Sequence, residues 1–159
     1  MNDIQVKICG LTRAADVELA IDAGADVVGF IFAPSPRRVD ASQAAALAQM
    51  AAGRARRVGL FMNPQAGEVQ QALASVDLDL LQFHGQEDND FCRSFGLPFL
   101  KAISMLDESA DRAILSYPDA VGVLLDSHAP GGAGGTGETF DWNRRVDCDK
   151  PIWLAGGLQ

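Results

Sequence analysis

Three titratable side chains stand at the ends of short apolar runs of the chain. They are Cys9, His84 and Asp126. Thiol, imidazole and carboxyl groups move protons in enzymes, so this placement favours acid–base chemistry on a small molecule. Each residue also has a structural interpretation: Cys9 as a small core residue, His84 as a satisfied structural histidine, and Asp126 as the cap of a turn.

Glycines and arginines after other apolar runs could bind a ligand. Gly156 and Gly157 follow the run Ile152–Ala155, and Arg37 and Arg38 lie in the segment after the run that ends at Phe32. Glycine leaves room for a ligand, and an arginine placed by its surroundings binds an anionic group. Arg37 and Arg38 could equally be solvated surface charges.

Seven short apolar runs, rich in Val, Ile, Leu and Phe, alternate with helix-like segments. Near-continuous apolar runs of this length indicate parallel strands covered on both faces. The expected strands are Ile4–Cys9, Val27–Phe32, Val58–Met62, Leu78–Phe83, Phe99–Ile103, Ala120–Leu125 and Ile152–Ala155. The expected helices are Ala14–Ala23, Gln43–Ala52, Pro64 to Ser75, Asp88–Phe95, a helix from Asp107 or Ser109 to near Ser116, and a short one in Asp141–Asp147.

Polar residues and glycines mark the ends of the expected helices. Thr12 and either Asp40 or Ser42 are expected N-caps, because their side chains accept hydrogen bonds from the first free N–H groups. Gly24, Gly53 and Gly96 are expected to end the helices that precede them.

The alternating order predicts a parallel sheet with right-handed crossovers. A doubly wound open sheet commonly has about five or six strands. Seven candidates therefore favour a (β/α)8 barrel of the TIM type that is incomplete, with about seven of its eight strands present. We expect residues 1–159 to form a single barrel domain that lacks the last βα unit, with exposed edges at its first and seventh strands. Function then gathers at the carboxyl ends of the strands.

Alternation along the strands predicts which side chains share a face. Lys7 lies on the face of Cys9, and Gln82 lies on the face of His84. If the reactive strand ends point inward, Lys7 and Gln82 lie in the interior, together with Lys101. Buried polar groups need partners, so we expect an internal network of lysine, glutamine and carboxylate groups.

Composition excludes several other classes of protein. The chain has 13 Lys and Arg against 21 Asp and Glu, a net charge of −8, and so lacks the basic surface of a nucleic-acid binder. Three cysteines without a CxxC pair and two histidines argue against a disulfide framework and against a metal site. The N-terminus has no signal-peptide pattern, and no apolar stretch approaches the roughly 20 residues of a membrane span, so a cytoplasmic protein is expected.

A set of motifs stands in order along essentially the whole chain. They are Val6–Thr12, Gly29–Phe32 with Ser35–Arg37, Val58–Asn63, Leu81–Gly85, Leu124–Asp126, Pro130–Gly132, Gly135–Gly137, Phe140–Trp142 and Leu154–Leu158. Together and at this spacing they resemble the phosphoribosylanthranilate isomerase family of tryptophan biosynthesis, an aromatic amino-acid pathway.

The resemblance implies a role for each candidate residue. Cys9 matches the general base and Asp126 the general acid, while Arg37 matches an arginine that binds the anthranilate carboxylate. Gly156 and Gly157 match a loop that helps to hold the substrate phosphate. His84 matches a position near the substrate.

The reaction that the resemblance implies is an Amadori rearrangement, the isomerisation of an aldose derivative to a ketose derivative. N-(5-phosphoribosyl)anthranilate becomes 1-(2-carboxyphenylamino)-1-deoxyribulose 5-phosphate. Placed acid and base groups suffice for this chemistry, so we expect neither a metal nor another cofactor. Lys7 beside Cys9 would favour its thiolate form, and burial would keep Asp126 protonated.

Two alternatives remain open at this stage. The chain could be an inactive barrel fragment that needs a complementing segment or a partner chain. Gln159 stands where the resemblance implies an asparagine that opens the next helix. It could also be another phosphate-binding barrel isomerase, such as one of histidine biosynthesis. Those enzymes usually use paired aspartates, and Cys9 argues against that possibility. The sequence leaves the oligomeric state open.

Overall fold

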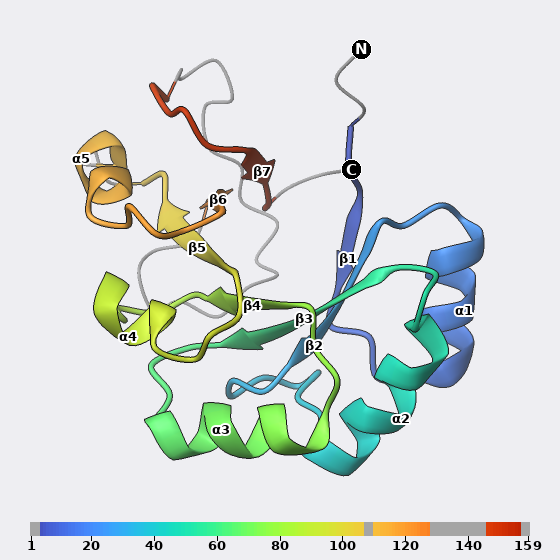
Figure 1. Ribbon diagram of the computed structural model, residues 1–159. Coiled ribbons are helices and arrows are strands. Elements are labelled where there is room, and N and C mark those ends of the chain that lie inside the picture. The colour runs from blue at the N-terminus through green and yellow to red at the C-terminus, as the bar shows by residue number, and fades with distance from the viewer. Residues whose placement is uncertain (1–3, 107–109, 128–145, 157–159) are drawn as a thin grey trace. The chain divides into compact units, whose positions relative to one another are not determined.

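The computed structural model describes residues 4–106, 110–127 and 146–156. Residues 1–81 and 82–159 form two compact units. The described strands are parallel to their neighbours and follow one another in chain order within each unit, as the alternating sequence pattern predicts (Figure 1).

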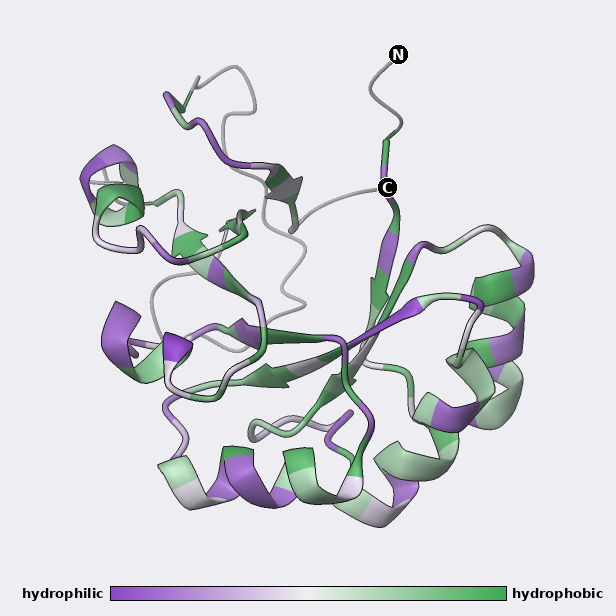
Figure 2. Cartoon of the chain, in the orientation of Figure 1, coloured by the Kyte–Doolittle hydropathy of each residue, from purple (hydrophilic) through white to green (hydrophobic). Residues whose placement is uncertain are grey.

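The first unit alternates strands and helices. Its elements are β1 (Lys7–Cys9), α1 (Ala14–Asp22), β2 (Val27–Ile31), α2 (Ala41–Ala51), β3 (Arg56–Phe61) and α3 (Ala66–Ser75), and β4 (Leu80–Phe83) crosses the division. Cys9 pairs with Gly29, and Ile31 pairs with Leu60, so the carboxyl ends of β1, β2 and β3 lie at one edge. The three helices carry alternating apolar and polar bands, whereas the strands are mostly apolar (Figure 2).

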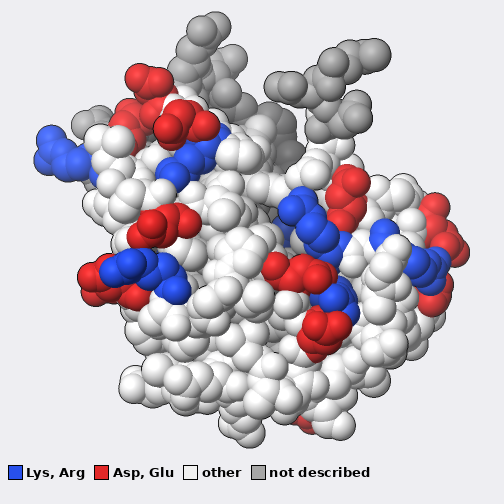
Figure 3. Space-filling model, in the orientation of Figure 1, with Lys and Arg blue, Asp and Glu red and all other residues white. Residues whose placement is uncertain are grey.

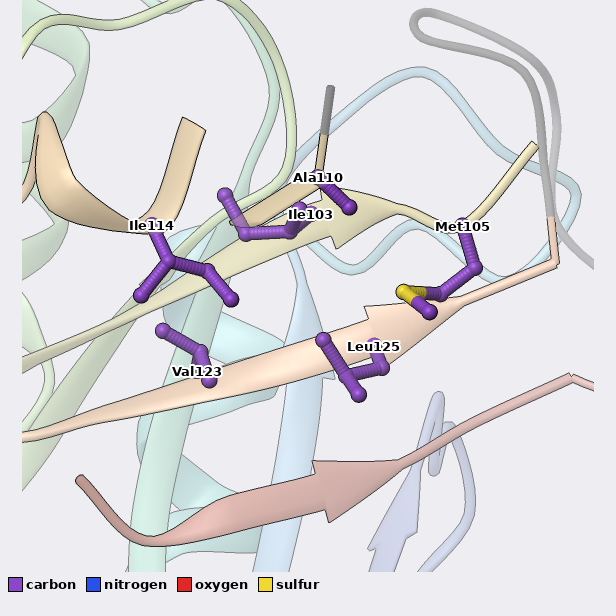
Figure 4. Close-up of a cluster of buried hydrophobic side chains, with 6 residues drawn as sticks. All are labelled: Ile103, Met105, Ala110, Ile114, Val123 and Leu125. Atoms are coloured by element: carbon purple, nitrogen blue, oxygen red, sulfur yellow. The ribbon is translucent and has the colours of Figure 1, made fainter. Parts of the chain in front are cut away.

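The second unit continues the alternation. Its further elements are α4 (Asn89–Arg93), β5 (Phe99–Ser104), α5 (Ala110–Leu115), β6 (Gly122–Asp126) and β7 (Ile152–Leu154). Side chains from β5, α5 and β6 form a buried cluster, which Figure 4 shows: Ile103, Met105, Ala110, Ile114, Val123 and Leu125. Apolar contact between a helix and two parallel strands fixes this βαβ unit, since burial of such side chains dominates the stability of a core.

The helix ends agree with the sequence in part. Asp40 is the N-cap of α2 and accepts from Gln43 N at 2.8 Å, and Gly24, Gly53 and Gly96 have positive φ after their helices. The prediction of Thr12 as a cap is wrong, because the N-cap of α1 is Arg13 and no side chain caps that helix. Pro64 lies before α3 rather than in its first turn.

Two predicted helix positions lie outside the described residues: the start at Asp107 or Ser109 and most of the segment Asp141–Asp147. Ile8 on β1 is 39% exposed, and Leu154 on β7 is 49% exposed; the expectation of exposed edges at these two strands stays a prediction. No described helix combines the length and apolar character needed to cross a bilayer.

Charged side chains of both signs intermingle on the face that Figure 3 shows. In the first unit, for example, Arg54 binds Glu18 at 2.8 Å and Asp22 at 2.9 Å. These pairs are exposed and contribute little stability individually.

A less exposed ion pair links the start of β3 to the segment before β4. The Arg57 guanidinium donates to both carboxylate oxygens of Asp79, at 2.8 and 2.9 Å, and Arg57 N also donates to Asp79 at 2.8 Å. Hydrogen bonds from Arg57 hold the pKa of Asp79 below its ordinary value, against the opposing effect of burial. A carboxyl whose pKa is lowered by folding stabilises the fold above its unfolded pKa and loses that contribution as the pH falls through its folded pKa.

Asp79→Asn is therefore expected to lower the free energy of unfolding by about 1 kcal/mol at pH 7, a modest value because solvent screens the partly exposed carboxylate. The difference from the parent should shrink as the pH falls below about 4, where the carboxyl of the unfolded chain is protonated. Urea unfolding at several pH values measures both. Asp77→Asn is the control, since Asp77 is 83% exposed and makes one bond to Arg57. An equal loss at pH 3 and pH 7 would contradict the argument.

Candidate active site

Cys9 stands at the carboxyl end of β1, half-buried and opposite Gly29. A Cβ at position 29 would lie 2.7 Å from Cys9 Sγ, so only glycine there leaves the thiol its place. Gly10 then turns the chain with φ +82°, and its N–H donates to Gly29 O at 2.9 Å. The geometry thus presents a thiol at the strand end where the sequence predicts a reactive group.

Arg37 lies beside Cys9 in the first unit. Its Nη1 donates to Cys9 O at 3.2 Å, and a Cβ on Gly10 would come 2.7 Å from the same nitrogen. The guanidinium is exposed, so its other N–H groups can meet an anion. The structure therefore brings Cys9 and Arg37 together. Lys7 is half-buried on the same strand, and its predicted influence on the thiolate stays a prediction.

The three cysteines differ in environment. Cys92 is fully buried, and this burial raises the pKa of its thiol to about 12. It is protonated at neutral pH and cannot act as a thiolate base. Cys9 and Cys148 are half-buried, and of these two only Cys9 ends a strand, since Cys148 precedes β7.

In the second unit, His84 follows β4 and Asp126 ends β6. The distance from His84 Nε2 to Asp126 Oδ2 is 3.0 Å, with 19% and 9% of the two side chains exposed. Gln82, 1% exposed, places its Nε2 3.3 Å from His84 Nδ1. The structure thus brings the predicted site residues His84 and Asp126 into direct contact, and Gln82 contacts the other ring nitrogen of His84.

A buried ion pair holds the backbone on both sides of His84. Lys101 Nζ lies 3.1 Å from Glu87 Oε2 and donates to the carbonyl oxygens of Phe83, at 3.4 Å, and Gly85, at 2.5 Å. Glu87 Oε2 also accepts from Gly85 N at 3.0 Å. Burying two charges is costly unless each finds partners, and here both do. This confirms the predicted lysine–carboxylate network for Lys101, while Gln82 bonds to His84 instead.

Gly156 follows β7 with φ +84°. A Cβ there would lie 3.2 Å from Asp126 Oδ1 and would collide with Ser127 Oγ, so a side chain is excluded. Ser127 is fully buried, and its hydroxyl has no hydrogen-bond partner among the described residues. Gly157, the other predicted phosphate-binding glycine, lies outside the described residues.

Sequence reasoning missed Glu87, Ser127 and the contact of Gln82 with His84. Glu87 lies in the segment between β4 and α4, where a carboxylate usually faces solvent, so no pattern marks it as buried. Ser127 directly follows Asp126, and only its proximity to Gly156 in space reveals it.

Two other kinds of site for the chemistry would be a metal-binding cluster and a cavity. Among the described residues, no cluster of three or more His, Cys, Asp or Glu side chains could hold a metal ion. The first unit has a cavity of about 220 Å³ whose lining includes Phe32, Arg38 and Phe61. Neither Cys9 nor Arg37 lines that cavity, so it is separate from the thiol.

Known proteins resemble this chain along nearly its whole length. A family model described as N-(5'-phosphoribosyl)anthranilate (PRA) isomerase matches residues 6–159. An isomerase of that name from Stenotrophomonas maltophilia (strain R551-3) is 52% identical over 159 residues, which are 97% of this chain and 73% of that protein. Its counterpart from Xanthomonas euvesicatoria pv. vesicatoria (strain 85-10) is 49% identical over 163 residues, with the same coverage of each chain.

Solved structures agree with the sequence relatives. The phosphoribosyl anthranilate isomerase of Thermotoga maritima matches with a TM-score of 0.84 at 31% identity, over 98% of this chain and 78% of that one. Another phosphoribosyl anthranilate isomerase, solved in complex with reduced 1-(o-carboxyphenylamino)-1-deoxyribulose 5-phosphate, matches with a TM-score of 0.78 at 29% identity, over 98% of this chain and 77% of that one.

Proposed function

This chain belongs to the N-(5'-phosphoribosyl)anthranilate isomerase family, and we propose that Cys9 and Asp126 perform the proton transfers of its reaction. The chain is an aldose–ketose isomerase of tryptophan biosynthesis whose substrate is a phosphorylated small molecule. The family match favours this function over the alternative of an inactive fragment. The observation that carries the residue assignment is that Cys9 and Asp126 each end a parallel strand at its carboxyl end.

The first step is ring opening. Asp126 in its acid form donates a proton to the ribose ring oxygen while the bond from C1 to that oxygen breaks. The lone pair of the anilino nitrogen forms a C1=N iminium bond, which replaces the lost bond. Asp126 leaves this step as a carboxylate, with His84 Nε2 3.0 Å from its Oδ2.

The second step removes a proton from carbon. The iminium withdraws electrons, so the C2 proton becomes acidic, and the Cys9 thiolate takes it. The C2–H electron pair forms C1=C2, the C1=N pair returns to nitrogen, and the product is an enolamine. In its tautomerisation the Cys9 thiol returns the proton to C1, where the C1=C2 pair forms the new C–H bond, and the C2 hydroxyl gives its proton to the Asp126 carboxylate as C2=O forms. The product is the 2-ketone, 1-(2-carboxyphenylamino)-1-deoxyribulose 5-phosphate, so substrate and product are isomers.

The substrate's two anionic groups need separate donors. Arg37 binds the anthranilate carboxylate, since its exposed guanidinium is held beside Cys9 by the bond to Cys9 O. Gly156 and Gly157 help to bind the phosphate through backbone N–H groups, which approach an anion closely where no side chain intervenes. His84 supports Asp126 near the substrate.

We also propose that the protein is cytoplasmic and that residues 1–159 form one domain.

The direct test is an activity assay on the chain. The purified protein is mixed with N-(5'-phosphoribosyl)anthranilate, and the fall of substrate fluorescence is followed with time. We expect first-order loss of fluorescence in proportion to protein concentration. A folded, soluble chain that leaves the fluorescence unchanged would support the inactive fragment instead.

Arg37→Met is expected to raise KM about 10- to 100-fold, because a hydrogen bond to a charged group contributes about 1.5–3 kcal/mol. The effect on kcat should be smaller, since the carboxylate is bound similarly before and during the reaction. Arg38→Met is the matched control: Arg38 is the next residue, is also exposed, and should leave KM near the parent value. Equal KM values for the two variants would remove Arg37 from the substrate site.

A further inference from the structure

We infer that Gln82 is a positioning residue that fixes which ring nitrogen of His84 carries the proton, and thereby which oxygen of Asp126 carries the acidic one. The inference rests on the proposed role of Asp126 as general acid. All three residues belong to the second unit, Gln82 on β4, His84 just after it and Asp126 at the end of β6.

The glutamine determines the tautomer. An amide nitrogen only donates hydrogen bonds, so Gln82 Nε2, 3.3 Å from His84 Nδ1, requires Nδ1 to accept. The proton of the neutral imidazole is then on Nε2. Gln82 is buried, and its Oε1 has no hydrogen-bond partner among the described residues. If the amide of Gln82 were turned the other way, its Nε2 would occupy the place of Oε1. Its two N–H donors would then lack the hydrogen bond to His84 Nδ1.

The tautomer determines the acid. His84 Nε2–H donates to Asp126 Oδ2, 3.0 Å away. In a protonated carboxyl group, the carbonyl oxygen is the better acceptor, so Oδ2 is the carbonyl oxygen and the proton rests on Oδ1. Oδ1 is also the oxygen next to Gly156, where a Cβ would lie 3.2 Å away. Glycine at that position leaves room for the Ser127 side chain, whose Oγ a Cβ there would meet first, so no side chain of residue 156 presses on Oδ1.

The position of His84 does not depend on Gln82. Lys101 and Glu87 hold the peptide groups on both sides of His84 through bonds to the carbonyl oxygens of Phe83 and Gly85 and to Gly85 N. A change at Gln82 therefore alters the proton on the ring while the backbone of His84 stays in place. This separation makes the role of Gln82 measurable apart from stability.

The test is nitrogen NMR on the whole chain with ¹⁵N-labelled histidine. The chain has two histidines, so His128→Gln assigns the signals of His84. In the parent we expect a protonated Nε2 and an unprotonated Nδ1 in the neutral ring. An Nδ1–H tautomer would overturn the inference at once, whatever the enzyme's activity, because it would mean that the amide presents its oxygen.

Two variants complete the test. In Gln82→Glu the carboxylate only accepts, so Nδ1 should become protonated; a folded variant in which Nδ1 stays unprotonated would contradict the inference. Gln82→Met removes the donor without burying a charge, and we expect roughly tenfold or greater loss of kcat with little change in KM, because a misplaced imidazole proton is costly in other acid–base sites too. Full kcat in this variant would also overturn the inference.

Leu81→Met is the matched control, since Leu81 is fully buried on the same strand and adjacent side chains of a strand point to opposite faces. It should keep both the tautomer and kcat. Failure of the proposed function would give a different result from failure of this inference. Asp126→Asn would then remain active, whereas the His84 tautomer that NMR measures in the parent does not depend on that activity.

Discussion

Replacing Cys9 with alanine is expected to lower kcat by about 10²- to 10⁴-fold, the range that a positioned general base contributes. The loss is expected because the C2 proton is removed by a base next to C2, and alanine has no group that can accept it. KM should change little, because the thiol meets the reacting carbon rather than the carboxylate or the phosphate. Steady-state fluorescence assays on parent and variant measure both constants.

The structure makes this substitution easy to interpret. Alanine keeps the Cβ and the backbone bonds of position 9, including the carbonyl that accepts from Arg37. Cys148→Ala is the matched control, because Cys148 is also a half-buried free cysteine. It should retain the parent's kcat. A Cys9→Ala variant with kcat within a factor of about three of the parent would rule out the thiolate as the base and would direct attention to another group.

The fold was largely predictable because parallel strands buried on both faces leave a plain pattern. All residues of β2 and β4, for example, are buried, and their apolar runs were recognised within a residue or two of their ends. The predicted family and barrel fold are confirmed by the match over residues 6–159 and by the similar solved structures. Helix starts were less certain: Asp40 is a cap, but Thr12 is not, since a propensity for capping does not ensure the local geometry.

The sequence predicts that Cys9 and Asp126 stand at strand ends, and in each unit the structure has them there; their roles in catalysis stay predictions. The contacts of the neighbouring side chains were not predictable. Gln82 on β4 and His84, just after it, are two residues apart in the sequence. Strand alternation predicts that their side chains lie close together, but it does not predict the hydrogen bond between them. The buried Glu87 and its bond to Lys101 depend on tertiary packing and have no sequence pattern.

Asp126→Asn is expected to lower kcat about 10²- to 10⁴-fold as well, through a different step. Asparagine has nearly the size of aspartic acid and can still accept from His84 Nε2, but its amide does not give up a proton at neutral pH. The ribose ring then stays closed, so the iminium does not form and Cys9 has no acidic proton to remove. KM should stay near the parent value, since the role proposed for Asp126 is to donate a proton and not to bind either anionic group of the substrate.

Combining the two substitutions tests whether Cys9 and Asp126 act in successive steps of one reaction or contribute independently to kcat. If ring opening must precede proton removal, the double variant Cys9→Ala, Asp126→Asn should be little slower than the slower single variant, because residues that act in one reaction sequence are not additive. Asp119→Asn is the control for Asp126: it is partly exposed in the same unit, bonded to Asn89, and should keep full activity. Retained activity in Asp126→Asn would mean that the ring opens without this acid, and the carboxyl would then serve only to orient His84.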